Sequence, residues 1–150
     1  MFASYLSERH EFMVAIIDDR VVGYSITRVV VDESELLNIA VEPASRGQGI
    51  GGLLLDECMR RCAAAGAVEM WLEVRASNAS ARALYVTRGF SEMGVRKRYY
   101  ESPREDAVLL RVALRTEGNE KVIPAGGSLN AVPDDLILSP ASHHPRQEPQ

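Results

Sequence analysis

The chain has 150 residues, of which 46% are hydrophobic and 25% are charged, as expected for one globular domain with a buried core. Its net charge of −4 argues against nucleic acid as a main partner, because phosphate backbones favour clustered Lys and Arg. No stretch approaches the roughly 18 apolar residues of a membrane span, and Glu8 and Arg9 stand where a secretory signal would be apolar. The sequence therefore predicts a cytoplasmic protein that contacts neither nucleic acid nor membrane.

The first part of the chain predicts three consecutive antiparallel strands. Residues 11–18 and 21–31 are rich in Val, Ile and Tyr, and Asp18-Asp19-Arg20 between them is typical of a short hairpin connection. A second turn at residues 32–34 leads into a third strand over residues 36–41.

A glycine-rich loop follows, with the sequence Arg46-Gly47-Gln48-Gly49-Ile50-Gly51-Gly52. Glycines let backbone N–H groups approach an anion, and the N-terminus of the helix predicted over residues 53–65 adds partial positive charge. The loop therefore predicts a nucleotide-like ligand, with a ligand-free glycine turn as the alternative. Gly47-x-Gly49-x-x-Gly52 also matches a dinucleotide fingerprint, but that fold needs more βα units than fit here, and a Walker-type Gly-Lys-Ser/Thr is absent.

The helix over residues 53–65 has one apolar face, and Gly66 is placed to end it. The two cysteines of the chain, Cys58 and Cys62, lie on or beside this face and are interpreted as buried small hydrophobes. A metal site would need two further ligands, and the histidines lie far away in sequence. The sequence therefore predicts no metal.

Residues 68–75 alternate between apolar and polar, which predicts a strand with Glu73 on its polar face. Asn78 is suited to cap a second helix, which Gly89 ends. Two strands over residues 90–98 and 106–114 complete the order βββαβαββ. The basic run Arg96-Lys97-Arg98 is interpreted as a solvated strand edge.

From Arg115 onward the composition changes to Pro, Gly, Ser, Asn, Gln and His. Such a segment cannot bury enough apolar area to offset an ordering entropy of about 1–2 kcal/mol per residue. We therefore expect a domain over residues 1–114 and a mostly disordered tail over residues 115–150. The apolar triplet Leu136-Ile137-Leu138 is interpreted as chance in preference to a docking segment.

Two motifs in this order, Arg46-x-x-Gly49-x-Gly51 and Asn78-x-x-Ala81-x-x-Leu84-Tyr85-x-x-x-Gly89-Phe90, resemble the GNAT family of acetyl-CoA-dependent N-acetyltransferases. The segments 37–43, 71–78 and 98–100 with 104–107 are similar to its RimI-like branch, which acetylates the N-terminal alanine of a ribosomal protein. The resemblance covers roughly residues 1–114. It implies an α/β (α+β) fold whose mixed, mostly antiparallel sheet splays between two central strands.

The resemblance also implies that coenzyme A lies in this splay. The pantetheine arm, whose two amides need partners, would pair with the open edge of the third strand, and the glycine loop would hold the pyrophosphate. The cofactor-binding residues implied are Ile39, Ala40, Val41, Arg46, Gly47, Gln48, Gly49, Ile50, Gly51, Gly52 and Asn78.

Acetyl transfer to an amine requires a neutral amine and a protonated leaving thiolate. The resemblance marks Glu73 as the base and Tyr85 as the acid, and the hydroxyl of Tyr85 is suited to this because a tyrosine is protonated at neutral pH. A backbone N–H near Val41 would meet the oxyanion. Taken alone, a strand glutamate is usually a solvated or ion-paired group and a helical tyrosine usually packs. Tyr99 and Tyr100 either line the acceptor site or only pack.

One physical argument bears on the acceptor. An α-amine titrates at about 7.7–8.0 and a lysine at about 10.4, so deprotonating a lysine at neutral pH costs about 3–4 kcal/mol more. A protein N-terminus is therefore favoured, and the resemblance implies the N-terminal alanine of a small-subunit ribosomal protein. A small amine or lysine acceptor, and an inactive cofactor-binding or interaction module, are the alternatives.

Two departures from the RimI-like pattern stand out. Proteins of that branch have a first strand and one or two helices before the segment matched by residues 1–4, so we expect a sheet that lacks this strand. Gly47 and Gly52 stand where relatives often carry basic or longer polar residues, which predicts slightly weaker phosphate contacts.

Overall fold

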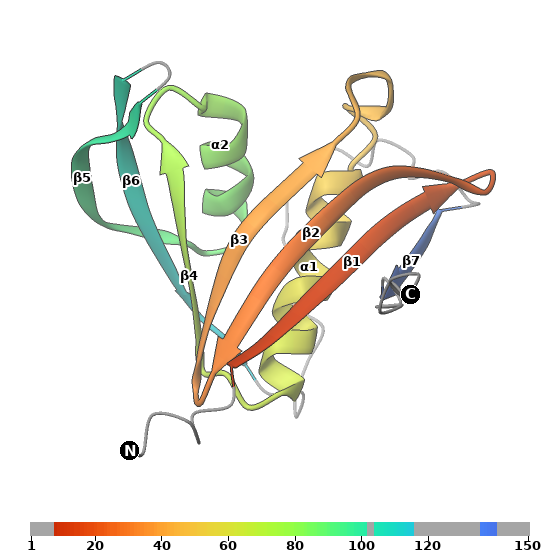
Figure 1. Ribbon diagram of the computed structural model, residues 1–150, viewed down its shortest axis with the longest axis horizontal. Helices are drawn as coiled ribbons and strands as arrows, with labels where there is room; N and C mark the ends of the chain where they lie inside the picture. Colours follow the sequence, from red (N-terminus) through yellow and green to blue (C-terminus); the bar gives the residue numbers. More distant parts are fainter. Residues whose placement is uncertain (1–7, 102–103, 116–135, 141–150) are drawn as a thin grey trace, which may run out of the picture.

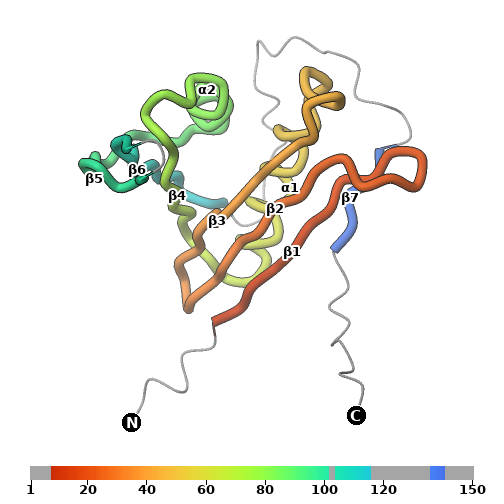
Figure 2. Tube along the Cα trace, turned by 45° about the horizontal axis from the view of Figure 1, so that its top comes forward, coloured from red at the N-terminus to blue at the C-terminus, as the bar shows by residue number. Residues whose placement is uncertain are grey.

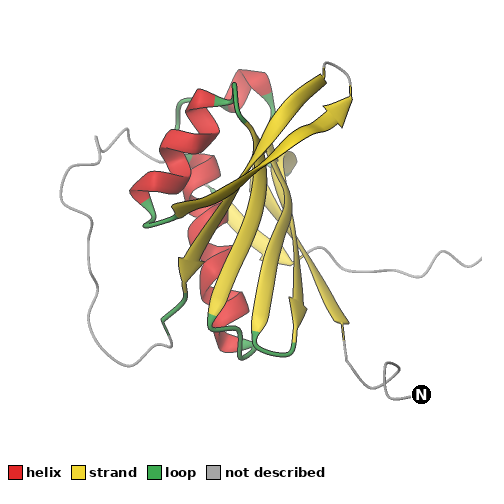
Figure 3. Ribbon diagram, turned by 90° about the vertical axis from the view of Figure 1, so that its left-hand side faces the viewer, coloured by secondary structure: helices red, strands yellow, loops and turns green. Residues whose placement is uncertain are grey.

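The computed structural model describes residues 8–101, 104–115 and 136–140. Its elements in chain order are β1 (Glu8–Ile17), β2 (Arg20–Val30), β3 (Glu33–Val41), a 3-10 turn (Pro43–Ser45), α1 (Ile50–Ala64), β4 (Glu69–Arg75), α2 (Ala79–Thr87), β5 (Ser91–Glu101), β6 (Arg104–Ala113) and β7 (Ile137–Pro140). They form one sheet in the order β5-β6-β4-β3-β2-β1-β7, with both helices on one face (Figures 1 and 3). The predicted order βββαβαββ is confirmed, and β7 is added to it.

Local sequence signals place the ends of several elements. Asp18 and Asp19 both have positive φ, 51° and 59°, as the tight hairpin between β1 and β2 requires. Gly66 and Gly89 follow α1 and α2 with φ of 99° and 88°, which only glycine adopts without strain. The predicted helix ends are confirmed, whereas α1 begins at Ile50, three residues before the predicted start at Leu53.

The core lies between α1 and strands β1 to β4. Leu54 and Leu55 of α1 are fully buried, as are Met70 and Leu72 of β4. Cys58 and Cys62 belong to the same cluster and form no disulfide. Burial raises the pKa of the Cys58 thiol to about 11, so this side chain stays a protonated, unreactive thiol at neutral pH.

The expectation of disorder is wrong for residues 137–140. These residues form β7, which pairs antiparallel with Met13–Ile16 of β1 (Figure 2). Leu136 and Leu138 pack against the core, so the apolar triplet is not a chance feature. β7 thus forms one edge of the described sheet, next to β1. The remainder of the expected tail, 116–135 and 141–150, lies outside the described residues.

If β7 is part of the folded sheet, replacing Leu138 with Asp should destabilise the protein. The change puts a charge on a side chain that packs against the core, and we expect a loss of about 1–2 kcal/mol in the free energy of unfolding. Thermal unfolding followed by circular dichroism measures it. Ile137→Asp is the matched control, because Ile137 is on the same strand and 58% exposed. Equal melting temperatures for both variants would contradict a structural role for β7.

Candidate active site

The two central strands separate after a short paired stretch. β3 and β4 form the one parallel pair among the described strands, and their pairing covers Glu33–Glu35 with Glu69–Trp71. Beyond it, β3 continues beside β2 while β4 continues beside β6, and the V between them is visible in Figure 1. A bulge at Leu37 lies where β3 leaves β4, since Leu36 and Asn38 are opposite the neighbours Thr27 and Ile26. Bulges bend strands, and the predicted splay is confirmed.

A cavity of about 600 Å³ occupies the upper part of this V. It is bounded by the end of β3, the glycine loop with the start of α1, and one face of α2. All the predicted cofactor-binding residues except Gln48 line it, together with Ser45, Ser80, Ala81, Leu84 and Tyr85. The structure thus brings the predicted residues to one place, while their binding roles stay predictions.

The glycine loop directs the N-terminus of α1 into this cavity. Gly47 and Gly49 have φ of 81° and 78°, and Gly49 is the N-cap residue. No side chain among the described residues caps the helix, and its first turn contains no acidic residue. The first N–H groups of a helix have no intrahelical partner, so the cavity end of α1 is suited to an anion. Arg46 holds the loop to β3, because its Nε donates to the carbonyl of Val41 at 3.0 Å.

Helix α2 forms the opposite wall. The side-chain oxygen of Asn78 accepts a hydrogen bond from the backbone N–H of Ala81 at 3.2 Å, which confirms the predicted N-cap. Ala81, Leu84 and Tyr85 follow at helical spacing and face the cavity. The sequence interpretation did not assign Ala81 or Leu84 to the site, although this spacing could have placed them beside Tyr85.

Glu73 and Tyr85 share a second cavity of about 310 Å³, lined by residues of β3 and β4 with Tyr100. This cavity and the first have Ile39, Asn78 and Tyr85 in common, so Tyr85 lies where they meet. Its ring is 5% exposed and packs edge-on against Phe90 with 5.6 Å between ring centroids. The two predicted catalytic side chains thus face one space, next to the space at the helix N-terminus.

Tyrosine hydroxyls around this space are held in their protonated form. Burial, and to a lesser extent Tyr100, raises the pKa of Tyr85 to about 12. The pKa of Tyr100 is raised by burial and by the charge of Glu73, and that of Tyr99 by its hydrogen bond to Glu73. The Tyr85 hydroxyl is therefore protonated across the neutral pH range. Tyr100 lines the cavity, and the guanidinium of Arg75 lies 4.3 Å from its ring centroid. Whether it contacts an acceptor stays a prediction.

Glu73 also has a partner that the sequence interpretation missed. Nε of Arg96 is 3.0 Å from Oε1 of Glu73, so the basic run on β5 is not merely a solvated edge. The pairing of β5 with β6 is irregular between Arg96 and Tyr100, and Arg98 has a positive φ of 55°. No periodicity could have indicated which side chain of this run turns toward β4.

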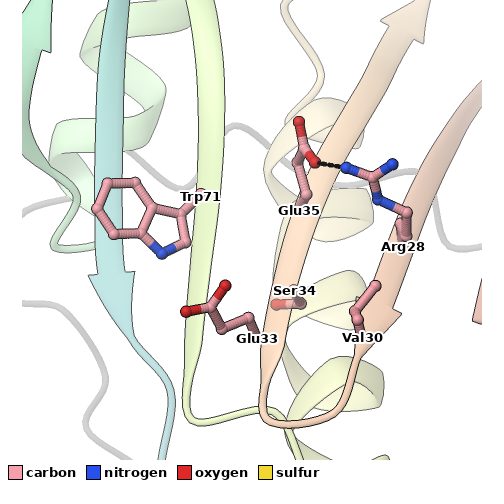
Figure 4. Close-up of a pocket in the computed structure, with 6 residues that line it drawn as sticks. All are labelled: Arg28, Val30, Glu33, Ser34, Glu35 and Trp71. Carbon is pink, nitrogen blue, oxygen red and sulfur yellow. Dashed lines mark hydrogen bonds and ion pairs between the residues drawn. The ribbon is translucent and has the colours of Figure 1, made fainter. Parts of the chain in front are cut away.

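A third, smaller pocket of about 230 Å³ lies at the foot of the V, where β3 and β4 are paired. Figure 4 shows its lining, in which Arg28 is hydrogen-bonded to Glu35 while Trp71 and Glu33 stand on the other side. None of the predicted site residues lines this pocket. Within the described part of the chain there is no cluster of three side chains that could hold a metal ion. Neither described helix has the length and hydropathy needed to cross a membrane.

Comparisons with known proteins agree on one family. The sequence model of the acetyltransferase (GNAT) family matches residues 1–90. The [ribosomal protein bS18]-alanine N-acetyltransferase of Salmonella typhimurium is 41% identical over 109 residues, 71% of this chain and 74% of that protein. The crystal structure of the Escherichia coli ribosomal-protein-S18-alanine N-acetyltransferase has a TM-score of 0.68 and 38% identity, covering 80% of this chain and 79% of that one. A GNAT acetyltransferase from Elizabethkingia anophelis, solved with acetyl-CoA bound, shares the fold with a TM-score of 0.66 at 22% identity, covering 70% and 76%.

Proposed function

Because the chain belongs to the acetyltransferase (GNAT) family, we propose that it transfers the acetyl group of acetyl-CoA to the N-terminal α-amine of a protein. The acceptor we propose begins with alanine, as the names of the relatives indicate for ribosomal protein bS18. One observation carries the proposal: Glu73 and Tyr85 face one cavity that adjoins the uncapped N-terminus of α1.

The lining of the first cavity supports acetyl-CoA as its ligand on chemical grounds. The N-terminus of α1 offers unpaired N–H groups to a pyrophosphate, and the edge of β3 at Ile39–Val41 offers backbone groups to the amides of the pantetheine arm. Asn78 and α2 close the other wall. When bound, acetyl-CoA supplies the acetyl thioester, and the residues of this chain position it and move the protons.

In the proposed reaction, Glu73 accepts the proton of the acceptor amine, and the Tyr85 hydroxyl donates a proton to the leaving thiolate. Arg96 contacts one carboxylate oxygen of Glu73 at 3.0 Å and Tyr99 is a further partner, so the carboxylate is held in a defined orientation. The raised pKa of Tyr85, about 12, keeps its proton available at neutral pH. A backbone N–H near Val41 would stabilise the charge that develops on the carbonyl oxygen.

An α-amine suits this site better than a lysine side chain. A single carboxylate must remove one proton, and at neutral pH this costs about 3–4 kcal/mol less for an α-amine than for a lysine. For a lysine acceptor, the same carboxylate would have to remove the proton at that higher cost.

The acceptor is tested with the full chain, acetyl-CoA and three amines: an Ala-starting peptide, the same peptide with a blocked N-terminus and an internal lysine, and a small polyamine. We expect thiol release with the first peptide alone, and mass spectrometry should place the acetyl group on its α-amine. Acetylation of the lysine or the polyamine in preference would contradict a protein N-terminus as acceptor. Cofactor binding without turnover on any amine would contradict an enzymatic role.

A further inference from the structure

Arg88 connects the end of α2 to the start of α1 across the V. It follows the last residue of α2, and its side chain is 26% exposed. Nε donates to Oδ1 of Asp56 at 3.1 Å, Nη2 donates to Oδ2 of the same carboxylate at 3.3 Å, and Nη1 donates to the hydroxyl of Thr87 at 2.9 Å. Asp56 is on α1, so this bidentate pair fixes the guanidinium beside the first turns of that helix.

The guanidinium occupies the place where a side chain of residue 52 would stand. A Cβ added to Gly52 would lie 2.3 Å from Nη2 and 3.1 Å from Cζ of Arg88. Gly52 is in the first turn of α1 and lines the larger cavity. Arg88 therefore lies against Gly52, beside the cavity and not among the residues that line it, and glycine at residue 52 makes this approach possible.

The remaining hydrogen-bond donors of Arg88 and the dipole of α1 both suit this position to a phosphate. The three hydrogen bonds use three of the five N–H donors of the guanidinium, so two donors remain. The first turn of α1 already carries the positive end of the helix dipole and has no acidic residue. Next to it, the guanidinium of Arg88, whose charge is paired with that of Asp56, still offers planar donors of the kind that bind phosphate oxygens.

We propose that Arg88 binds the pyrophosphate of coenzyme A from the α2 side of the V, and that Gly52 is glycine because its missing side chain makes room for this guanidinium. Asp56 is then a positioning residue, which holds Arg88 in place. This inference rests on the proposed function, which places coenzyme A in the larger cavity.

The test measures binding, without turnover, by isothermal titration of the full chain and of Arg88→Ala. We expect Arg88→Ala to raise the Kd for coenzyme A about tenfold, or about 1.4 kcal/mol. The same ratio is expected for dephospho-coenzyme A, which keeps the pyrophosphate, and no change for pantetheine, which has no phosphate. Arg60→Ala is the matched control, because it removes an exposed arginine that pairs with Glu57 on α1; its Kd for coenzyme A should equal that of the unaltered chain.

A second variant separates a phosphate contact from a structural role of Arg88. Gly52→Ala displaces the flexible end of Arg88 while the charge is kept, and alanine also favours the helix. We expect a melting temperature that is unchanged or higher, together with weaker binding of coenzyme A. In the presence of Arg88→Ala, the added Gly52→Ala should have no further effect on the Kd, since there is no guanidinium left to displace.

The other outcomes are distinct from one another. If Arg88→Ala weakened the binding of pantetheine and of coenzyme A by the same factor, Arg88 would be a structural residue and the inference would be overturned. If Arg88→Ala weakened the binding of coenzyme A and left the binding of dephospho-coenzyme A unchanged, the pyrophosphate assignment would be overturned. An unchanged Kd in Arg88→Ala would overturn the inference alone, whereas an unaltered chain that binds no coenzyme A would overturn the proposed function.

Discussion

Tyr85→Phe is expected to lower kcat about 10²- to 10³-fold, the size of effect usual for loss of a general acid. The substitution removes the hydroxyl proposed as the general acid and keeps the ring that packs against Phe90. The Kd for coenzyme A should therefore stay close to that of the unaltered chain. Steady-state kinetics with the Ala-starting peptide, together with titration of coenzyme A, measure both quantities.

Tyr24→Phe is the control for this experiment. Tyr24 is on β2, is 40% exposed, and its hydroxyl accepts a hydrogen bond from Asn38, so its loss should leave kcat unchanged. A Tyr85→Phe variant with the kcat of the unaltered chain would show that another group protonates the thiolate.

The raised pKa of Tyr85 has a second measurable effect, on stability. The pKa is about 12 in the folded chain and about 10 in an unfolded one. Between these values the folded state binds more protons than the unfolded state, so the free energy of unfolding falls as pH rises above about 10. The contribution is fully present below that pH. Tyr85→Phe should lack this part of the alkaline decline, and urea unfolding at pH 9 and pH 11 compares the two chains.

Glu73→Gln is expected to lower kcat/KM at pH 7 about 10²-fold or more, because glutamine has the same shape and cannot accept the proton of the amine. The defect should shrink as pH rises, since above the α-amine pKa of about 7.7–8.0 the acceptor is already neutral. A profile of kcat/KM from pH 6.5 to 9.5 shows whether the two curves converge. Because glutamine is uncharged, the variant loses the ion pair with Arg96. Its melting temperature is therefore recorded as well, to detect any loss of stability.

Glu92→Gln is the control for the base. Glu92 is on β5, is exposed and pairs with Arg82 at 3.5 Å, outside both cavities. Its kcat/KM should match that of the unaltered chain at every pH. The kcat/KM values of the unaltered chain and of Glu73→Gln are then compared. If their ratio is constant across the pH range, Glu73 is not the base and has a positioning role.

Much of the fold could be predicted because it depends on local preferences. The hairpin at Asp18-Asp19, the cap at Asn78 and the positive-φ glycines Gly66 and Gly89 each act within one turn of chain. The order of the two motifs also indicated the family, and the family comparisons confirm it. The predicted start of α1 is three residues late because Gly51 and Gly52 disfavour a helix interior, whereas in the structure they belong to its first turn.

By itself, therefore, the sequence determined the order of elements, the glycine loop and the position of Glu73 and Tyr85 on a strand and a helix. Only the tertiary structure paired Glu73 with Arg96, set Arg88 over Gly52, and placed β7 against β1. The physical reason is the separation along the chain between the residues that interact. Turns, caps and periodicity are decided by neighbours along the chain, whereas these three contacts join segments that meet only when the sheet register and the helix packing bring them together.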